Sequence, residues 1–100
     1  MAIGLVMTFE GVTQASYDAA MASDGLDLHA PSNPNATDDW PKGILGHYAG
    51  PTPTGWCVVD IWNSQAEFDD FMASRLGPTL GKVGIPEPNV TPFEVYNSHT

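Results

Sequence analysis

The sequence has few basic residues. Lys42, Arg75 and Lys82 stand against 12 acidic residues, which gives a formal net charge of −9 at pH 7. A charge of this sign repels the phosphate backbone of nucleic acids and the headgroups of anionic lipids. We therefore expect neither a nucleic-acid partner nor a membrane partner.

Cysteine is nearly absent, and the single Cys57 excludes an internal disulfide framework. Its apolar surroundings, with no cation nearby in the sequence, favour an inert thiol over a nucleophile. The first residues lack the charged segment and cleavage site of a secretory signal. No apolar run reaches the roughly 20 residues of a membrane helix. We therefore expect a cytoplasmic, reducing environment.

The length and composition favour one compact unit. One hundred residues supply material for one hydrophobic core, so we predict a single domain over residues 1–100. No glycine-rich phosphate loop is present, and we expect no cofactor. The three histidines, His29, His47 and His99, lack the spacing of metal ligands, so we expect no metal site.

The first part of the chain predicts a strand, a helix and a long loop. Residues 2–9 are apolar at both odd and even positions, which is typical of a strand covered on both faces. Thr13 can cap a helix over about 13–24, and Gly25 can end it. Prolines, asparagines and aspartates then indicate an irregular loop over 25–42, which we interpret as a lid or a dimer arm.

Two further strands follow this loop. Residues 43–49 and 55–62 are separated by Gly50-Pro51-Thr52-Pro53-Thr54, whose glycine and prolines indicate the turn of a β-hairpin. The segment 92–97 alternates well enough for a last strand, with its proline at the first position, where no donor is needed.

A second helix is predicted between the hairpin and the last strand. Ser64-Gln65-Ala66-Glu67 is a capping box that opens it. Its buried stripe consists of Phe68, Phe71, Met72, Arg75 and Leu76. We expect Gly77-Pro78 to break this helix.

The order β-α-β-β-α-β predicts an α+β ferredoxin-like fold with two helices on one face of a four-stranded antiparallel sheet. The first and third strands are apolar at both odd and even positions. An isolated chain would therefore expose an apolar patch on the face of the sheet that carries no helix. A second copy packed sheet to sheet would cover it, and we therefore expect a homodimer. The alternative is that the 25–42 loop covers this face.

One segment resembles a known superfamily. The stretch Gly55-Trp56-Cys57-Val58-Val59-Asp60-Ile61-Trp62-Asn63-Ser64, followed by Phe68 and Phe71, resembles the strand-to-helix segment of the dimeric α/β-barrel superfamily. The resemblance is to small actinobacterial proteins related to antibiotic-biosynthesis monooxygenases. It extends to Gly43 and His47, to the Leu76-Pro78 segment and to Phe93-Glu94-Val95. The superfamily includes cofactor-free oxygenases, polyketide cyclases, muconolactone isomerases and haem-degrading enzymes.

The haem-degrading members carry a Trp and a His ten positions apart in and after the second helix. Aligned on Trp62 and Ser64, this chain has Phe71 and Gly81 at those places. The resemblance therefore does not imply haem breakdown.

Asp60 is the most unusual residue of its strand, because a carboxylate between Val58 and Trp62 on a buried face must be hydrogen-bonded or have its pKa raised. If Gly50 pairs with Gly55, His47 lies diagonal to Asp60 on the same face, and the two form a candidate catalytic pair. A one-residue slip would place Tyr48 there instead. The alternative is that Asp60 anchors a neighbouring backbone or loop amide.

Aromatic residues supply the candidate ligand-binding site. Trp56 and Trp62 share one face of their strand and could line a flat pocket for a small apolar or aromatic molecule, or serve as core. Tyr17 and Tyr96 are further candidate pocket hydroxyls. We thus hypothesise a cofactor-independent monooxygenase, cyclase or isomerase of secondary metabolism. The alternatives are a non-catalytic ligand-binding or stress-response module and a structural dimer without a pocket.

Overall fold

The computed structural model describes residues 1–28, 33 and 35–99. The strands are β1 (Ile3–Glu10), β2 (Ile44–Thr52), β3 (Gly55–Trp62) and β4 (Asn89–Glu94), and the helical segments are α1 (Gln14–Ser23), α2 (Gln65–Phe71), the π-helix η1 (Met72–Leu76) and α3 (Gly77–Val83). The strands form one antiparallel sheet in the order β2-β3-β1-β4. The predicted α+β ferredoxin-like fold is confirmed.

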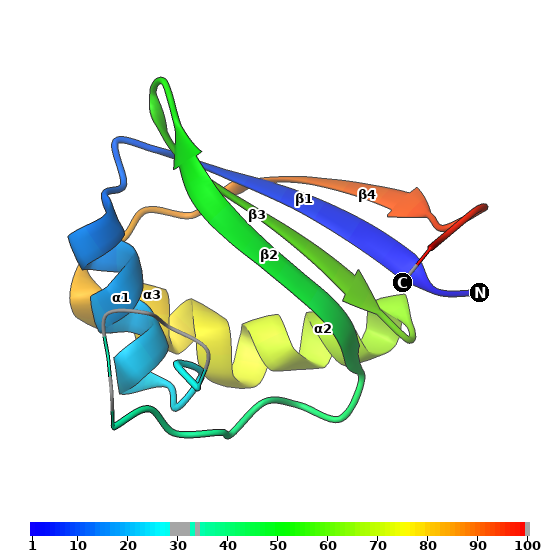
Figure 1. The fold of residues 1–100 in the computed structure, drawn as a ribbon, viewed down its shortest axis with the longest axis horizontal. Helices are drawn as coiled ribbons and strands as arrows, with labels where there is room; N and C mark the ends of the chain where they lie inside the picture. The colour runs from blue at the N-terminus through cyan, green and yellow to red at the C-terminus, as the bar shows by residue number, and fades with distance from the viewer. Residues whose placement is uncertain (29–32, 34, 100) are drawn as a thin grey trace.

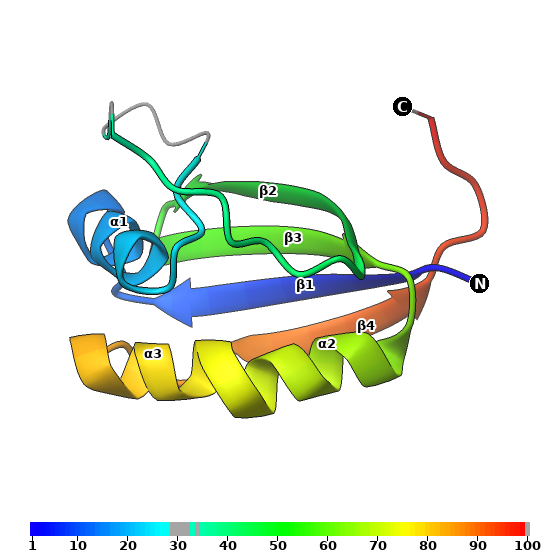
Figure 2. The same cartoon turned by 90° about the horizontal axis from the view of Figure 1, so that it is seen from below.

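All helices lie on the same face of the sheet. Figure 1 shows α1, α2 and α3 below the strands, and Figure 2 shows α2 continuing into α3 beneath β1 and β4. Burial alternates along β3, whose even-numbered residues face the helices. The largest fully buried side chains are Trp62, Leu5 and Met7. The core therefore fills the space between the sheet and the helices.

The prediction that Gly77-Pro78 ends the second helix is wrong. The chain widens into η1, where the Gly77 N–H donates to Met72 O, and then continues as α3 to a left-handed Gly84. Proline lacks an N–H and its ring collides with a carbonyl of the preceding turn. The wider π-helical turn offers a way to accommodate the proline without ending the helix. A Cβ at Gly77 would lie 2.6 Å from Met72 O, so this position also requires glycine.

The last strand begins earlier than predicted. It spans Asn89–Glu94 instead of 92–97, and Pro92 lies inside it, opposite Leu5. A proline is tolerated there because β4 is an edge strand, one side of which needs no hydrogen-bond donor. The Val95 N–H donates to Ala2 O at 3.0 Å, after which the chain leaves the sheet.

The hairpin is tighter than predicted, and the expected pairing of Gly50 with Gly55 is wrong. Gly55 pairs with Thr52, which leaves only Pro53 and Thr54 as the turn. Pro53 suits this turn because its φ angle is already restricted. The register is irregular between Ile44 and Gly46, so one extra residue bulges from the edge strand β2.

The 25–42 loop, where described, lies on the helix side of the sheet (Figure 1). The Asp39 N–H donates to Gly25 O at 2.7 Å. The Arg75 guanidinium donates to Asp24 O at 2.8 Å and to the Asp39 carboxylate at 3.4 Å. For the described residues, the alternative in which this loop covers the other face of the sheet is therefore wrong.

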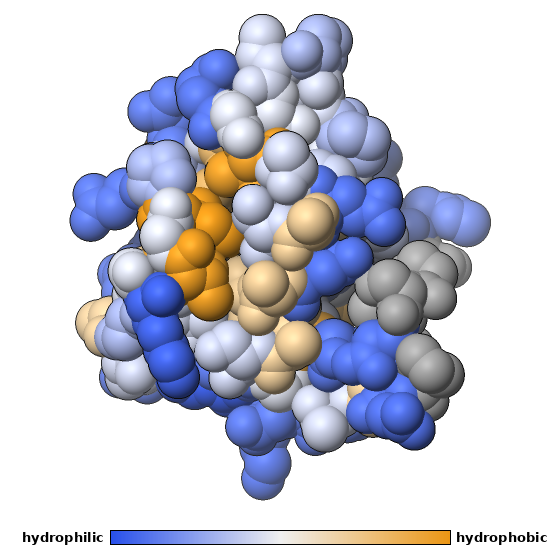
Figure 3. All heavy atoms as spheres, turned by 90° about the vertical axis from the view of Figure 1, so that its left-hand side faces the viewer, coloured by the Kyte–Doolittle hydropathy of each residue, from blue (hydrophilic) through white to orange (hydrophobic). Residues whose placement is uncertain are grey.

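The end of the molecule that carries α1 is largely hydrophilic, with more hydrophobic side chains gathered in a band at its middle (Figure 3). Within residues 1–28, 33 and 35–99, no helix is long and apolar enough to cross a membrane.

Candidate functional site

A buried histidine–aspartate pair lies at the centre of the site. His47 of β2 and Asp60 of β3 are directly opposite each other in the sheet, and His47 Nδ1 lies 2.7 Å from Asp60 Oδ1. Asp60 is only 3% exposed. The pair is closer than the predicted diagonal arrangement, because Gly55 pairs with Thr52 instead of Gly50, and this two-residue shift of β2 brings His47 opposite Asp60. Tyr48 points to the opposite face and is 66% exposed.

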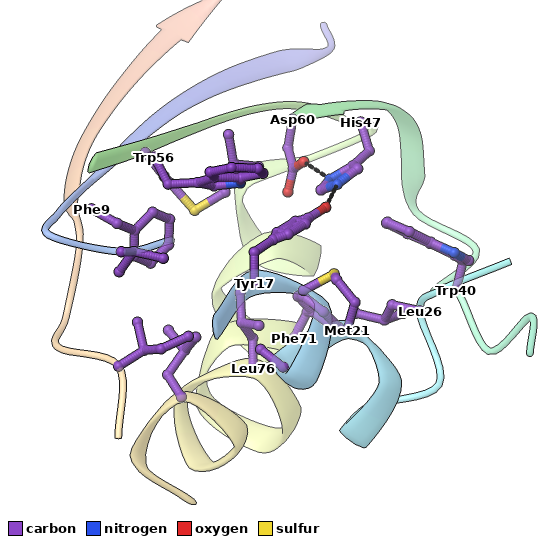
Figure 4. A pocket seen from close by; sticks show the side chains of 16 residues that line it. Phe9, Tyr17, Met21, Leu26, Trp40, His47, Trp56, Asp60, Phe71 and Leu76 are labelled. Atoms are coloured by element: carbon purple, nitrogen blue, oxygen red, sulfur yellow. Dashed lines mark hydrogen bonds and ion pairs between the residues drawn. The ribbon is translucent and has the colours of Figure 1, made fainter. Parts of the chain in front are cut away.

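Two further side chains extend this pair into a hydrogen-bonded chain. The Tyr17 hydroxyl of α1 lies 2.6 Å from His47 Nε2. The indole N–H of Trp62 donates to Asp60 Oδ2 at 3.2 Å. Figure 4 shows Tyr17, His47 and Asp60 in line at the wall of a cavity. Both carboxylate oxygens of Asp60 are therefore occupied by side chains.

The chemistry of the three groups determines which atom donates and which accepts in each hydrogen bond. An aspartate carboxylate only accepts hydrogen bonds, so His47 Nδ1 carries the hydrogen that points to Asp60. In the neutral ring, Nε2 is then an acceptor, and the Tyr17 hydroxyl donates to it. The arrangement can pass a proton from Tyr17 to His47 and stabilise the resulting imidazolium with Asp60.

The electrostatic surroundings keep Tyr17 protonated. Burial raises the pKa of the Tyr17 hydroxyl well above its ordinary value, and the negative charges of Asp60 and then Asp18 raise it further. All three effects disfavour the tyrosinate anion. Tyr17 therefore acts as a neutral hydroxyl at neutral pH, and it can lose its own proton only while it receives another.

The chain of hydrogen bonds faces two connected spaces. A cavity of about 40 Å³ lies between the sheet and the helices. A groove of about 650 Å³ adjoins it and falls in the usual size range of ligand pockets, roughly 300–1,000 Å³. The residues that line both are Tyr17, Met21, Leu26, Trp40, His47 and Trp56. Tyr17 and His47 thus stand where the groove meets the cavity.

Two tryptophans flank this junction. The Trp56 ring lies 5.1 Å from the Tyr17 ring, and the Trp40 ring lies 4.7 Å from the His47 ring, centroid to centroid. Trp56 belongs to the predicted site, but Trp40 does not. The only signal for Trp40 in the sequence is an aromatic residue at the end of an irregular loop, and nothing local places it against His47.

Hydrogen bonds within the loop hold the segment that precedes Trp40. Asp27 is buried and accepts from the Thr37 N–H at 3.0 Å and from the Thr37 hydroxyl at 3.1 Å, and the Asn33 amide donates to it as well. The Thr37 N–H is the main cause that lowers the pKa of Asp27, against the opposing effect of burial. An ionised Asp27 thus ties the described parts of the loop together.

The remaining predicted residues lie outside the cavity wall. Trp62 is fully buried behind Asp60 and packs against the rings of Phe68 and Phe71 at 5.8 and 5.3 Å. Tyr96 is 97% exposed in the C-terminal segment. In the part of the chain that the structure describes, no three His, Cys, Asp or Glu side chains converge as a metal site would require. His29 lies outside the described residues.

Fold and site together define a ferredoxin-like α+β protein with an Asp-His-Tyr chain between sheet and helices. No protein-family model and no curated protein matches the sequence. A similar solved structure is that of a protein from Chloroflexus aurantiacus provisionally named an antibiotic biosynthesis monooxygenase. The TM-score is 0.61 and the identity 16%, over 100% of this chain and 98% of that chain. At this identity the likeness shows the fold alone.

Proposed function

We propose that this protein is a cofactor-independent enzyme that transfers a proton to and from a small aromatic or polyketide-like molecule, as a monooxygenase, cyclase or isomerase does. The observation that carries the proposal is the chain Asp60–His47–Tyr17, with contacts of 2.7 and 2.6 Å, at the wall of an apolar cavity. The fold of the Chloroflexus protein supports the same class of activity by analogy.

The proton transfer uses the three side chains as one base. Tyr17 gives its hydroxyl proton to His47 Nε2 while its oxygen takes a proton from the ligand, and the charge of the imidazolium is balanced by Asp60. The raised pKa of Tyr17 makes this coupling necessary, because a free tyrosinate is disfavoured. Return of the proton to another atom of the ligand completes an isomerisation. In a monooxygenase, dioxygen would bond to the deprotonated carbon of the ligand and take the proton back as a hydroperoxide. Loss of water from this hydroperoxide would leave a carbonyl on the ligand.

The groove indicates the kind of ligand. Its walls include Trp40, Trp56 and Leu26, which offer flat and apolar surfaces to an aromatic body. The net charge of −9 disfavours ligands that carry several negative charges. A neutral or weakly acidic ring compound fits both conditions.

The first test measures proton abstraction without knowledge of the natural substrate. The enzyme is incubated in D₂O with 2-tetralone, a bicyclic ketone with an acidic C–H next to its carbonyl, and deuterium incorporation is followed by NMR. We expect catalysed exchange by the wild type and a loss of about 10²- to 10⁴-fold in Tyr17→Phe and His47→Gln. An oxygen electrode on the same samples distinguishes oxygenation from simple exchange.

Tyr48→Phe is the matched control, because Tyr48 also carries a phenol but lies on the opposite face of the sheet. It should exchange at the wild-type rate. Exchange by the wild type no faster than in buffer contradicts an enzymatic role. Binding of tetralone without exchange would instead favour the non-catalytic ligand-binding module.

We also propose that the protein forms a homodimer through the outer face of its sheet. Val6, Val59 and Ile61 on this face are only half-buried, and Phe93 is 44% exposed. No described element covers these side chains (Figure 1). A second copy would remove this apolar surface from water.

A further inference from the structure

Trp56 carries a hydrogen-bond donor that no described residue of the protein accepts. Its side chain is buried, at 8% exposure, and its indole N–H finds no acceptor among the residues that the structure describes. Buried donors in native proteins nearly always have a partner, so an exception calls for a specific explanation.

The position of this donor points to the cavity. Trp56 lines both the cavity and the groove, and its ring lies 5.1 Å from that of Tyr17. Figure 4 shows the indole nitrogen on the edge of the ring that faces the cavity and Tyr17. An N–H donor and the hydroxyl at the end of the Asp60–His47–Tyr17 chain therefore face the same space.

The other two tryptophans differ in this respect. The Trp62 N–H already donates to Asp60. The Trp40 N–H is unpaired within the described residues as well, but Figure 4 shows its nitrogen on the end of the ring away from His47 and the cavity. Trp56 is thus the tryptophan whose free N–H can meet a ligand beside Tyr17.

We propose that the Trp56 N–H donates to a ligand oxygen on which negative charge develops when Tyr17 takes a proton. This proposal rests on the proposed function for the position of the ligand. The ligand is then a phenol, an enol or an enolisable ketone whose remaining part is flat and apolar. Because the nearby Asp60 and Asp18 carboxylates repel an anion, a neutral donor pointing at the oxygen is needed to stabilise it.

The test compares two probes that differ in one hydroxyl, 4-nitrophenol and nitrobenzene. The phenolate form of 4-nitrophenol is coloured, so its ionisation on the protein is followed by absorbance near neutral pH. We expect the wild type to bind the phenolate in preference to the phenol, which lowers the pKa of the bound probe relative to the free one. This comparison requires no variant.

Variants then assign the preference to Trp56. Trp56→Phe keeps a ring in place and removes the N–H, and we expect it to bind the phenolate about 10- to 100-fold more weakly. Its affinity for nitrobenzene should stay within about twofold, since both proteins offer an apolar wall of similar kind. Tyr48→Phe is the control, because it also removes a hydrogen-bond donor from an aromatic side chain, but one that is exposed on the opposite face of the sheet, outside the cavity and the groove.

Three outcomes would overturn the proposal: an unchanged pKa of the bound probe, failure of the wild type to bind either probe, or equal weakening of both probes by Trp56→Phe. The deuterium exchange of tetralone separates this proposal from the proposed function. Exchange that depends on Tyr17 and His47 without phenolate preference rejects only the role of Trp56. Phenolate preference without exchange rejects only the enzymatic function.

Discussion

A carboxylate inside an apolar sheet has to be compensated, and Asp60 shows how this chain does so. One oxygen accepts from His47 and the other from Trp62, so neither is left unpaired in a place that water does not reach. The anomaly itself was visible in the sequence, because Asp60 lies between Val58 and Trp62. Its partner His47 was predictable only as far as the hairpin register was known.

Tyr17 provides a prediction for pH dependence. Its raised pKa stabilises the folded protein below the ordinary value of 10.0, and this contribution is lost as the pH rises above that value. In the folded state, wild type and Tyr17→Phe should therefore show the same phenolate absorbance change up to about pH 11. Spectrophotometric titration measures it.

Titration of the unfolded proteins in denaturant is the control. There, one more tyrosine should ionise in the wild type than in Tyr17→Phe. If the folded proteins already differ by one tyrosine near pH 10, the burial of the Tyr17 hydroxyl is contradicted.

At the scale of elements, the path of the long helix depends on one glycine. Gly77 N–H bonds to Met72 O in the π-helical turn, and a Cβ at Gly77 would lie 2.6 Å from that oxygen. Gly77→Ala should therefore lower the free energy of unfolding by about 1–3 kcal/mol, because backbone must shift to admit the methyl group. Urea denaturation followed by circular dichroism measures the change.

Gly81→Ala is the matched control in the same helix. A Cβ at Gly81 meets nothing within 4 Å, and alanine is the better helix former. This variant should be more stable than the wild type by up to about 1 kcal/mol. If Gly77→Ala is equally stabilising, the π-helical turn does not restrict this position.

The elements also show where local patterns were sufficient. Four consecutive residues are enough to predict the capping box at Ser64, and the Ser64 hydroxyl accepts from the Glu67 N–H as predicted. The continuation of the helix through Pro78 could not be predicted, because no local sequence pattern indicates a π-helical turn that accommodates proline. The sequence predicts too late a start for the last strand, because a proline is typical of a strand's first position, whereas an edge strand can also hold a proline inside.

On the scale of the whole molecule, the proposed homodimer depends on the outer face of the sheet. Val59 lies between Tyr48 and Val6 in the register, at the centre of this face. Val59→Glu should convert a dimer into single chains that keep their circular dichroism spectrum, because two carboxylates would be buried at the interface. Sedimentation at micromolar concentration measures the state of assembly.

Ala73→Glu is the control for this variant, since Ala73 is exposed on η1, away from the outer face. It should sediment like the wild type. A wild-type protein that sediments as a single chain would contradict the dimer.

The order of elements, the inward faces of β1 and β3 and the unusual Asp60 were determined by the sequence, because periodicity and capping are local properties. Only the tertiary structure decided that Tyr17, Trp40 and His47 meet. They come from a helix, a loop and a strand, and their contact depends on a two-residue turn and on the hydrogen bonds of Arg75. Such long-range contacts depend on register and packing between distant segments, which no local pattern encodes.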